Sequence, residues 1–588
     1  MYAKKFASVA LVILIALLGF IISPPSHSPG KYKAEINIDL DYNAHAVIIF
    51  YFNLTSEEVE GKLVKYSNTT MLILDNSIRY FTIIATGYDS YQLKPGTKVD
   101  FTLTIYLDNE KIFVKPTKIT GVVTLPNGKR EKALILSYGE ELIFRFAVRY
   151  QSHIAIVTLF VISFLWLSEI IPLVASALLV PVIAVLFGLM SPKEALSPMF
   201  DPIIALFFGG FLLAKAMNKH YLDRRFAFHI ISKVGTPQRL LFIVMLATCF
   251  LSFWMSNTAV AALMLPIAIA TLKVTEKDKG TNYSKAIILG VAYSATVGGM
   301  GTLIGTPPNA IAVSFLKYIS GIELSFLDWM IYALPFTFLM LVVAFFYLNF
   351  VYSISEDVSK GRISISDNVD IIQMHLVDLG DMKREEKLTI TVLAVTVSLW
   401  LTQKLPISIF GWRGHGISAG IIALLSAVVL LVLGILDPKD IREISWETLL
   451  IFGGGLVLGE MLIASGMSEW IVTHFISIRN PFIILIILGF LSLIVTAFAS
   501  NTASAVILLP LAIPLGAALG INPVIPALVV ALGTSIDFAL PIGTPPTMLA
   551  YSTGYVKFRE IVKVGFPLMI MGVLLLVFLM TPIWLLLI

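Results

Sequence analysis

The sequence is poor in charge and in cysteine, and both shortages limit what the chain can be. Only 14% of its 588 residues are charged, whereas 57% are hydrophobic. A soluble core cannot bury that much apolar surface, so the composition predicts a polytopic α-helical membrane protein in contact with the lipid bilayer. The one cysteine, Cys249, can form neither a disulfide within the chain nor a cysteine-rich metal site.

The sequence supports neither an ATP-driven protein nor a nucleic-acid-binding protein. The sequence contains no G-x-x-x-x-G-K-[ST] phosphate-binding motif, so nothing points to ATP as a source of energy, and we expect no organic cofactor. The formal net charge of +4 could suggest a nucleic-acid partner. The basic residues lie mostly in short loops between apolar segments, however, and membrane orientation explains them better.

The N-terminal part of the chain divides into an anchor and a β-rich region. Residues 1–30 hold an apolar stretch that follows Lys4 and Lys5, and we interpret them as a transmembrane anchor, the first helix, with a cleaved signal peptide as the alternative. Residues 31–149 show short β-rich runs broken by Asn, Gly and Pro. This pattern predicts an extracytoplasmic all-β domain of seven to nine strands, as in a sandwich.

From residue 150 onward, apolar segments long enough to cross a bilayer recur. They define a first transmembrane repeat at 150–355, a cytoplasmic linker at 356–387 and a second transmembrane repeat at 388–588. Each repeat also holds an apolar block that Ser-Asn-Thr splits in its middle. Because polar residues interrupt the block, it is poorly suited to cross the membrane as one continuous helix. We therefore predict a re-entrant hairpin in each repeat.

An internal duplication supports this division. LFFGGFLLAKAM resembles LIFGGGLVLGEM, FWMSNTAVAALMLPIAI resembles AFASNTASAVILLPLAI, and LIGTPPNAIA resembles PIGTPPTMLA, in the same order in both halves. Each repeat has an odd number of crossings plus one hairpin that returns to its own side. The second repeat is therefore expected to be inverted relative to the first.

The loop charges predict the orientation in a plasma membrane. With a cytoplasmic N-terminus, the predicted cytoplasmic segments carry twenty-one Lys and Arg residues and the short outer loops carry five. This asymmetry supports a multi-pass protein whose β domain and C-terminus lie outside.

The paired Ser-Asn-Thr and Gly-Thr-Pro-Pro motifs carry the chemistry. Ser, Asn and Thr are preferred N-caps, so the second half of each hairpin is predicted to begin there. Gly-Thr-Pro-Pro, at 305–308 and 543–546, predicts a break in a membrane helix at which Thr caps the second half. Helix N-termini at the membrane midplane attract an anion, and helix C-termini attract Na⁺. Neutral polar groups plus Na⁺ suit a coupled symporter better than fixed positive charge does.

These motifs and the inverted halves resemble the divalent anion/sodium symporter family over about residues 150–588 and the first helix. The resemblance implies secondary active transport of a small divalent anion, such as the C4-dicarboxylate succinate, by alternating access in a homodimer, with Na⁺ as the co-transported ion. It implies two sodium sites, the first at Ser252, Ser256, Asn257 and Gly305, and the second at Thr496, Ser500, Asn501 and Gly543. For the anion it implies contacts from Asn257, Thr258, Thr306, Asn501, Thr502, Thr544 and Pro545. Asn309 follows the first Gly-Thr-Pro-Pro as in the family, whereas Thr547 stands at the second.

Other functions remain open at this point. Within transport, the alternatives are anion exchange and proton coupling. A G-x-S-x-G motif lies beside His415, at Gly416-Ile417-Ser418-Ala419-Gly420. It suggests an intramembrane hydrolase as an alternative function, although small-residue helix packing also explains it. A sensor whose β domain binds a ligand is the third class. The ionisable Asp537, at a depth where the family usually has a small or apolar residue, has three open roles: structural, sodium-binding or proton-carrying.

Overall fold

The computed structural model describes ten strands between residues 30 and 147 and, beyond them, residues 152–231, 236–275, 281–354, 379–405, 412–465, 480–540 and 543–588. Nearly all of the anchor predicted at 1–30 and most of the linker predicted at 356–387 lie outside the described residues.

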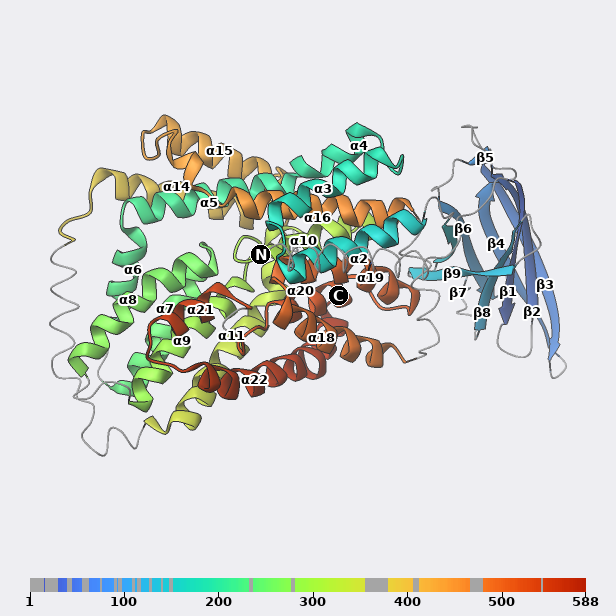
Figure 1. Cartoon of the computed structure of the whole chain (residues 1–588). Helices are drawn as coiled ribbons and strands as arrows, with labels where there is room; N and C mark the ends of the chain where they lie inside the picture. Colours follow the sequence, from blue (N-terminus) through green and yellow to red (C-terminus); the bar gives the residue numbers. More distant parts are fainter. Residues whose placement is uncertain are drawn as a thin grey trace.

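Ten strands precede the helices and lie to one side of them (Figure 1). They are β1 (Gly30–Asp39), β2 (His45–Leu54), β3 (Leu63–Leu74), β4 (Ser77–Tyr88), β5 (Gln92–Leu93), β6 (Lys98–Leu107), β7 (Ile112–Phe113), β8 (Lys118–Thr124), β9 (Arg130–Tyr138) and β10 (Glu141–Ala147). The sequence predicts seven to nine strands, and the structure has ten between residues 30 and 147. Two of these, β5 and β7, have only two residues each.

The strands pair in the order β3-β4-β6-β10-β9-β8-β1-β2-β5, with β7 on β6. All pairs are antiparallel except β2 with β5. Ala34 of β1 lies opposite Val123 of β8, and both side chains are fully buried. The alternation of apolar and polar residues fixes this register, because a shift by one residue would turn the apolar face outward. That the strands form a domain outside the membrane stays a prediction.

The helices of the first half begin directly after the strands. They are α2 (Ser152–Ser168), α3 (Leu173–Leu186), α4 (Pro192–Leu196), α5 (Pro202–Lys219), α6 (Leu222–Ile231), α7 (Pro237–Ser252), α8 (Asn257–Thr275), α9 (Asn282–Gly299), α10 (Pro307–Ser320) and α11 (Phe326–Tyr352), with the 3₁₀ turn η2 (Ser197–Phe200).

The helices of the second half follow the same order of long, split and broken segments. They are α14 (Arg384–Leu401), α15 (Ala419–Val432), α16 (Trp446–Ala464), α18 (Pro481–Phe498), α19 (Asn501–Ala518), α20 (Val524–Thr534), α21 (Pro545–Ser552), α22 (Phe558–Leu574) and α23 (Thr581–Leu587), with the 3₁₀ turn η3 (Asp440–Glu443) and the π-helical turn η4 (Leu575–Met580).

Six helical segments among the described residues are long and apolar enough to cross a membrane: Pro192–Lys219, Phe326–Tyr352, Trp446–Ala464, Pro481–Phe498, Asn501–Ala518 and Phe558–Leu587. Large apolar side chains on their outer faces are exposed, such as Phe350 at 82% and Leu586 at 89%. A water-soluble protein rarely leaves such side chains uncovered, whereas a membrane protein turns them to lipid.

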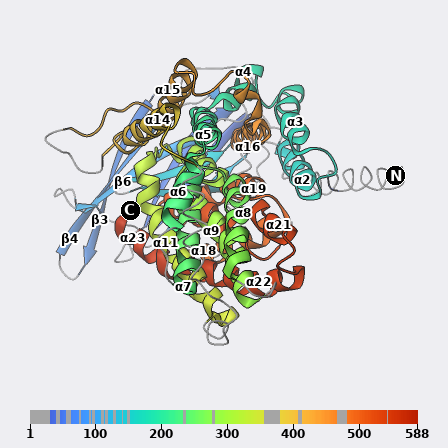
Figure 2. The same cartoon turned by 90° about the vertical axis from the view of Figure 1, so that its left-hand side faces the viewer.

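The two halves pack against each other throughout the helical part. Helix α5 packs on α15, α3 on α16 and α10 on α19. Helix α9 packs against α7, α8 and α11 of its own half and against α21 of the other (Figure 2). Phe207 of the first half and Phe452 of the second half meet edge to face at 5.8 Å. Segments more than two hundred residues apart in the sequence therefore surround a common centre.

Candidate functional site

The tips of two hairpins form the first part of the site. Helix α8 begins at Asn257, and the Ser256 hydroxyl accepts a hydrogen bond of 3.3 Å from the Ala259 amide. Helix α19 begins at Asn501, and the Ser500 hydroxyl is its N-cap, accepting from the Ala503 amide at 3.2 Å. The prediction that the second half-helix starts at Ser-Asn-Thr is confirmed at both tips.

Two breaks in helices form the second part. Helix α9 ends at Gly299 and α10 begins at Pro307, while α20 ends at Thr534 and α21 begins at Pro545. The threonines of both Gly-Thr-Pro-Pro motifs stand at the N-cap positions, but neither side chain makes a capping hydrogen bond. The predicted capping role of these threonines is therefore wrong. A cap of this kind accepts from the amide of the second or third helical residue, and the second residue here is a proline, Pro308 or Pro546, which has no amide hydrogen.

The break in the first half is held by Asn309. Its Nδ2 amide donates to the carbonyl oxygens of Gly299 at 2.9 Å, Met300 at 3.2 Å and Thr302 at 2.7 Å. At the matching position of the second half, Thr547 instead shares a hydrogen bond of 2.9 Å with the Thr544 hydroxyl. The departure from the family pattern at Thr547 thus removes a backbone clamp from the second break.

Four oxygen atoms converge beside the first hairpin tip. The Ser252 hydroxyl oxygen lies within hydrogen-bonding distance of two acceptors, the carbonyl oxygen of Ala295 at 2.7 Å and Asn257 Oδ1 at 2.8 Å, and its single hydrogen can serve only one of them. The Asn257 terminal atom at that place also faces Ala295 O at 3.1 Å and Gly305 O at 3.3 Å, two acceptors. If the amide were turned, Nδ2 would lie there with two hydrogens for these three partners. A bound cation would satisfy the same oxygens with the amide as it stands. A hard cation is bound by several oxygen atoms at once, so an asparagine oxygen that faces other acceptors fits such a site.

The second hairpin tip repeats this arrangement. The Thr496 hydroxyl oxygen likewise lies within hydrogen-bonding distance of two acceptors, Asn501 Oδ1 at 2.7 Å and the carbonyl oxygen of Thr534 at 2.6 Å, and it can donate to only one of them. Ser252 and Thr496 are both fully buried, and each precedes its Ser-Asn-Thr motif by four residues, about one helical turn. The neutral hydroxyl, amide and carbonyl oxygens of both clusters fit Na⁺, which is cargo in the predicted reaction.

One cavity of about 750 Å³ joins all four motifs. Its lining includes every residue predicted to contact the anion: Asn257, Thr258, Thr306, Asn501, Thr502, Thr544 and Pro545. Ser256, Gly305, Ser500 and Gly543, predicted for the sodium sites, also line it. Ser252 and Thr496 do not line it and lie behind it, which separates the two hydroxyls from the space open to a larger solute.

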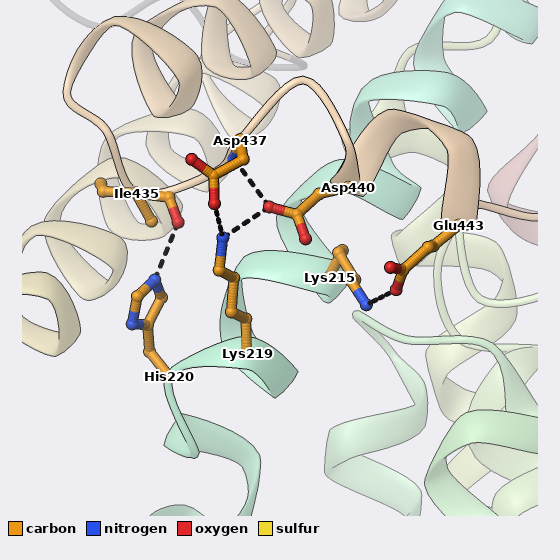
Figure 3. Close-up of polar contacts among 7 residues, drawn as sticks. All are labelled: Lys215, Lys219, His220, Ile435, Asp437, Asp440 and Glu443. Carbon is orange, nitrogen blue, oxygen red and sulfur yellow. Dashed lines mark hydrogen bonds and ion pairs between the residues drawn. The ribbon is translucent and has the colours of Figure 1, made fainter.

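Charged residues also line the same cavity. Lys215 of α5, Arg224 of α6 and Glu443 of η3 belong to its lining, together with the neutral Asn218. Lys215 forms an ion pair with Glu443 across the two halves (Figure 3). Sequence reasoning left Lys215 without this partner, because the two residues are 228 positions apart and no local pattern joins them.

A second ion-pair group lies beside the first. The Lys219 ammonium contacts Asp437 at 2.8 Å and Asp440 at 2.6 Å, and a ring nitrogen of His220 lies 2.9 Å from the Ile435 carbonyl oxygen (Figure 3). Burial raises the pKa of the Asp440 carboxyl and the Lys219 hydrogen bond lowers it, with a net direction below the ordinary value. Asp440 therefore stays ionised at neutral pH and ties α5 to the loop before α16.

The G-x-S-x-G segment shows no hydrolase geometry. The Ser418 hydroxyl caps α15 by accepting from the Ile421 amide at 3.4 Å. The His415 ring nitrogens contact the Leu399 carbonyl oxygen at 2.8 Å and the Ile417 amide at 3.0 Å. A histidine engaged with backbone on both sides cannot serve as the base of a neighbouring serine.

Comparison with known proteins identifies the family. The model of the sodium:sulfate symporter transmembrane region matches residues 147–588. The chain belongs to this symporter family. This confirms the resemblance seen in the motifs and places the chain among transporters rather than enzymes. The match begins where the strands end, so the ten strands precede the family region.

Similar proteins extend over most of the helical part. An uncharacterized transporter of Haemophilus influenzae is 37% identical over 417 residues, which are 69% of this chain and 86% of that one. Sodium-dependent dicarboxylate transporters SdcS of Staphylococcus saprophyticus and Staphylococcus aureus are 30% and 31% identical, over 70% of this chain and 82% of theirs. Among solved structures, the YdaH transporter of Alcanivorax borkumensis is 12% identical with a TM-score of 0.47, over 69% of this chain and 88% of that one.

Proposed function

We propose that the chain couples the inward movement of a small divalent anion, a C4-dicarboxylate such as succinate, to Na⁺ by alternating access. The observation that carries this proposal is the single cavity in which the hairpin tips and helix breaks of both halves meet. The dicarboxylate class comes from the relatives named as sodium-dependent dicarboxylate transporters.

Helix N-termini supply the attraction for the anion. Helices α8, α10, α19 and α21 all begin at this cavity, and each N-terminus carries a partial positive charge of about half a unit. The two carboxylates of a dicarboxylate would bind to the two halves. One carboxylate binds to Asn257, Thr258 and Thr306. The other binds to Asn501, Thr502, Thr544 and Pro545.

The oxygen clusters behind the cavity couple this anion to Na⁺. Ser252, Ser256, Asn257 and Gly305 form one ion site, and Thr496, Ser500, Asn501 and Gly543 form the other. A bound cation places positive charge beside the anion and leaves together with it, whereas a lysine or arginine would hold its charge at the site in every state. The substrate therefore binds well only while the ions are present.

The position of the cavity supports an inward-facing state. Its lining includes Lys215, Arg224 and Glu443, which lie in or beside segments that the loop charges assign to the cytoplasm. In this orientation the N-terminus is cytoplasmic, and the strands and the C-terminus lie outside the plasma membrane. We further propose that the two halves are inverted repeats and that the chain acts as a homodimer.

Uptake by the purified full chain in liposomes tests this function. Labelled succinate, citrate, sulfate and phosphate would be offered in Na⁺ or in K⁺ at equal ionic strength. We expect succinate uptake that requires an inward Na⁺ gradient. Uptake that needs an anion inside the vesicle but no Na⁺ would favour exchange, and uptake in K⁺ that follows a pH gradient would favour proton coupling. Either result would contradict sodium symport.

A further inference from the structure

Asp537 is a buried carboxylate that the function described so far does not use. It lies in the segment between α20 and α21, at the second helix break, and its side chain is fully buried. Neither of its carboxylate oxygens has a hydrogen-bond partner among the described residues. An isolated charge buried in this way is strongly unfavourable, so a buried carboxylate normally pairs with a cation or a donor.

The carboxylate lies against Gly543, whose backbone is predicted to belong to the second ion site. A Cβ atom added to Gly543 would overlap Asp537 Oδ2, so the carboxylate occupies the space beside the Gly543 Cα. The Thr544 hydroxyl also lies 3.4 Å from the Asp537 carbonyl oxygen, which fixes the chain on both sides of Gly543. The acidic group is therefore held next to the predicted ion site rather than turned to lipid.

The residue of the first half that corresponds to Asp537 is Gly299. Asp537 precedes Gly543 by six residues, as Gly299 precedes Gly305. A Cβ atom added to Gly299 would overlap Asn257 Oδ1, the oxygen at the centre of the first cluster. This position thus borders the ion site in the first half, where it carries no side chain, and in the second half it carries a carboxylate.

We propose that Asp537 supplies an anionic oxygen to the second ion site, beside Thr496, Asn501 and Gly543. This inference rests on the sodium coupling proposed above and extends it to a difference between the two sites. The first site consists of neutral oxygens, whereas the second carries a fixed negative charge. A cation bound there is neutralised by the protein itself, so it binds without the substrate and ahead of the ion in the first site.

Sodium binding without transport tests this directly. The full chain is purified, and its apparent Tm is measured against Na⁺ concentration, without anion, with choline keeping the ionic strength constant. Asp537→Asn should raise the Na⁺ concentration at half-maximal stabilisation by about tenfold or more, since tenfold corresponds to about 1.4 kcal/mol of binding free energy. In choline alone, the variant should be at least as stable as the wild type, because an unpaired buried charge has been removed. Asp537→Gly, which installs the residue of the first half, should show the same shift in Na⁺ dependence.

Asp201→Asn is the matched control. Asp201 is also buried, but its carboxylate accepts hydrogen bonds from the Ile203 amide and the Tyr318 hydroxyl, away from the ion sites. This variant should lower the Tm at every Na⁺ concentration without moving the Na⁺ midpoint. If the Asp537 variants behave like this control, the carboxylate is structural and the inference is wrong. If the wild type shows neither stabilisation by Na⁺ nor Na⁺-dependent uptake, the proposed function itself fails.

Discussion

Removing the Asn309 side chain tests how the first helix break is held. Its amide group has two hydrogens and faces three backbone carbonyl oxygens at 2.7 to 3.2 Å, all of it buried. Each buried carbonyl that loses its donor costs about 1 to 3 kcal/mol, so two lost hydrogen bonds cost about 2 to 6 kcal/mol. Asn309 Oδ1 has no partner of its own, and its removal offsets part of this loss. We therefore expect Asn309→Ala to destabilise the protein by about 2 to 4 kcal/mol.

The matching variant of the second half provides the control. Thr547→Ala removes one hydroxyl pair with Thr544, which contributes about 1 kcal/mol. Asn309→Asp keeps the shape of the side chain but replaces the donor with oxygens that face three carbonyls, so it should be more harmful than alanine. The apparent Tm and the Na⁺ dependence of uptake would be measured for all three variants. Because the clamp holds the backbone next to Asn257, Asn309→Ala should also raise the Na⁺ concentration needed for uptake.

Two results would refute this reasoning. The first is equal stability of Asn309→Ala and Thr547→Ala, because the structure gives the first residue a larger role. The second is a stable Asn309→Asp variant, because a carboxylate cannot donate to the carbonyl oxygens of the break.

Three further predictions concern the ions, the anion and the strands. Ser252→Ala and Thr496→Ala should each raise the Na⁺ concentration for half-maximal uptake while the protein still inserts and folds; unchanged Na⁺ dependence in both would remove the assigned sites. Asn257→Ala and Asn501→Ala should each weaken succinate binding at saturating Na⁺ by about 1 to 3 kcal/mol, measured by competition, and unchanged binding would move the anion site elsewhere. The chain without residues 31–149 should retain Na⁺-dependent uptake in vesicles, whereas loss of uptake in a well-inserted protein would assign the strands a part in transport.

The sequence predicts positions along the chain better than contacts across it. The Ser-Asn-Thr motifs mark helix starts because N-capping is local chemistry that three residues specify. The Gly-Thr-Pro-Pro motifs mark the interruptions between Gly299 and Pro307 and between Thr534 and Pro545, because proline favours the first turn of a helix. The capping role expected for Thr306 is wrong, because residue preference indicates a position but not the hydrogen bond made there.

Contacts between distant segments follow no such pattern. The four oxygens around Asn257 come from α7, α8, α9 and the following break, and only tertiary packing brings them together. The sequence supplied Ser252, Asn257 and Gly305 through a family resemblance, but gave no sign of the Ala295 carbonyl, since any residue type has one. The contact between Asp537 and Gly543 likewise depends on how the chain turns within the break.

The charges around the cavity explain how a site without fixed positive charge at its centre can still bind a dianion. Lys215 of the lining is paired with Glu443, and Lys219 beside it with two aspartates, so these lysines add little net positive charge, and Arg224 is a further basic residue of the lining. The helix N-termini at the motifs supply only partial charges. Of the two proposed Na⁺ ions, the one in the second site would be neutralised by Asp537, so the ion in the first site would supply most of the remaining attraction. The substrate then balances mainly the ion in the first, neutral site, so its affinity should depend more steeply on occupancy of that site than of the second.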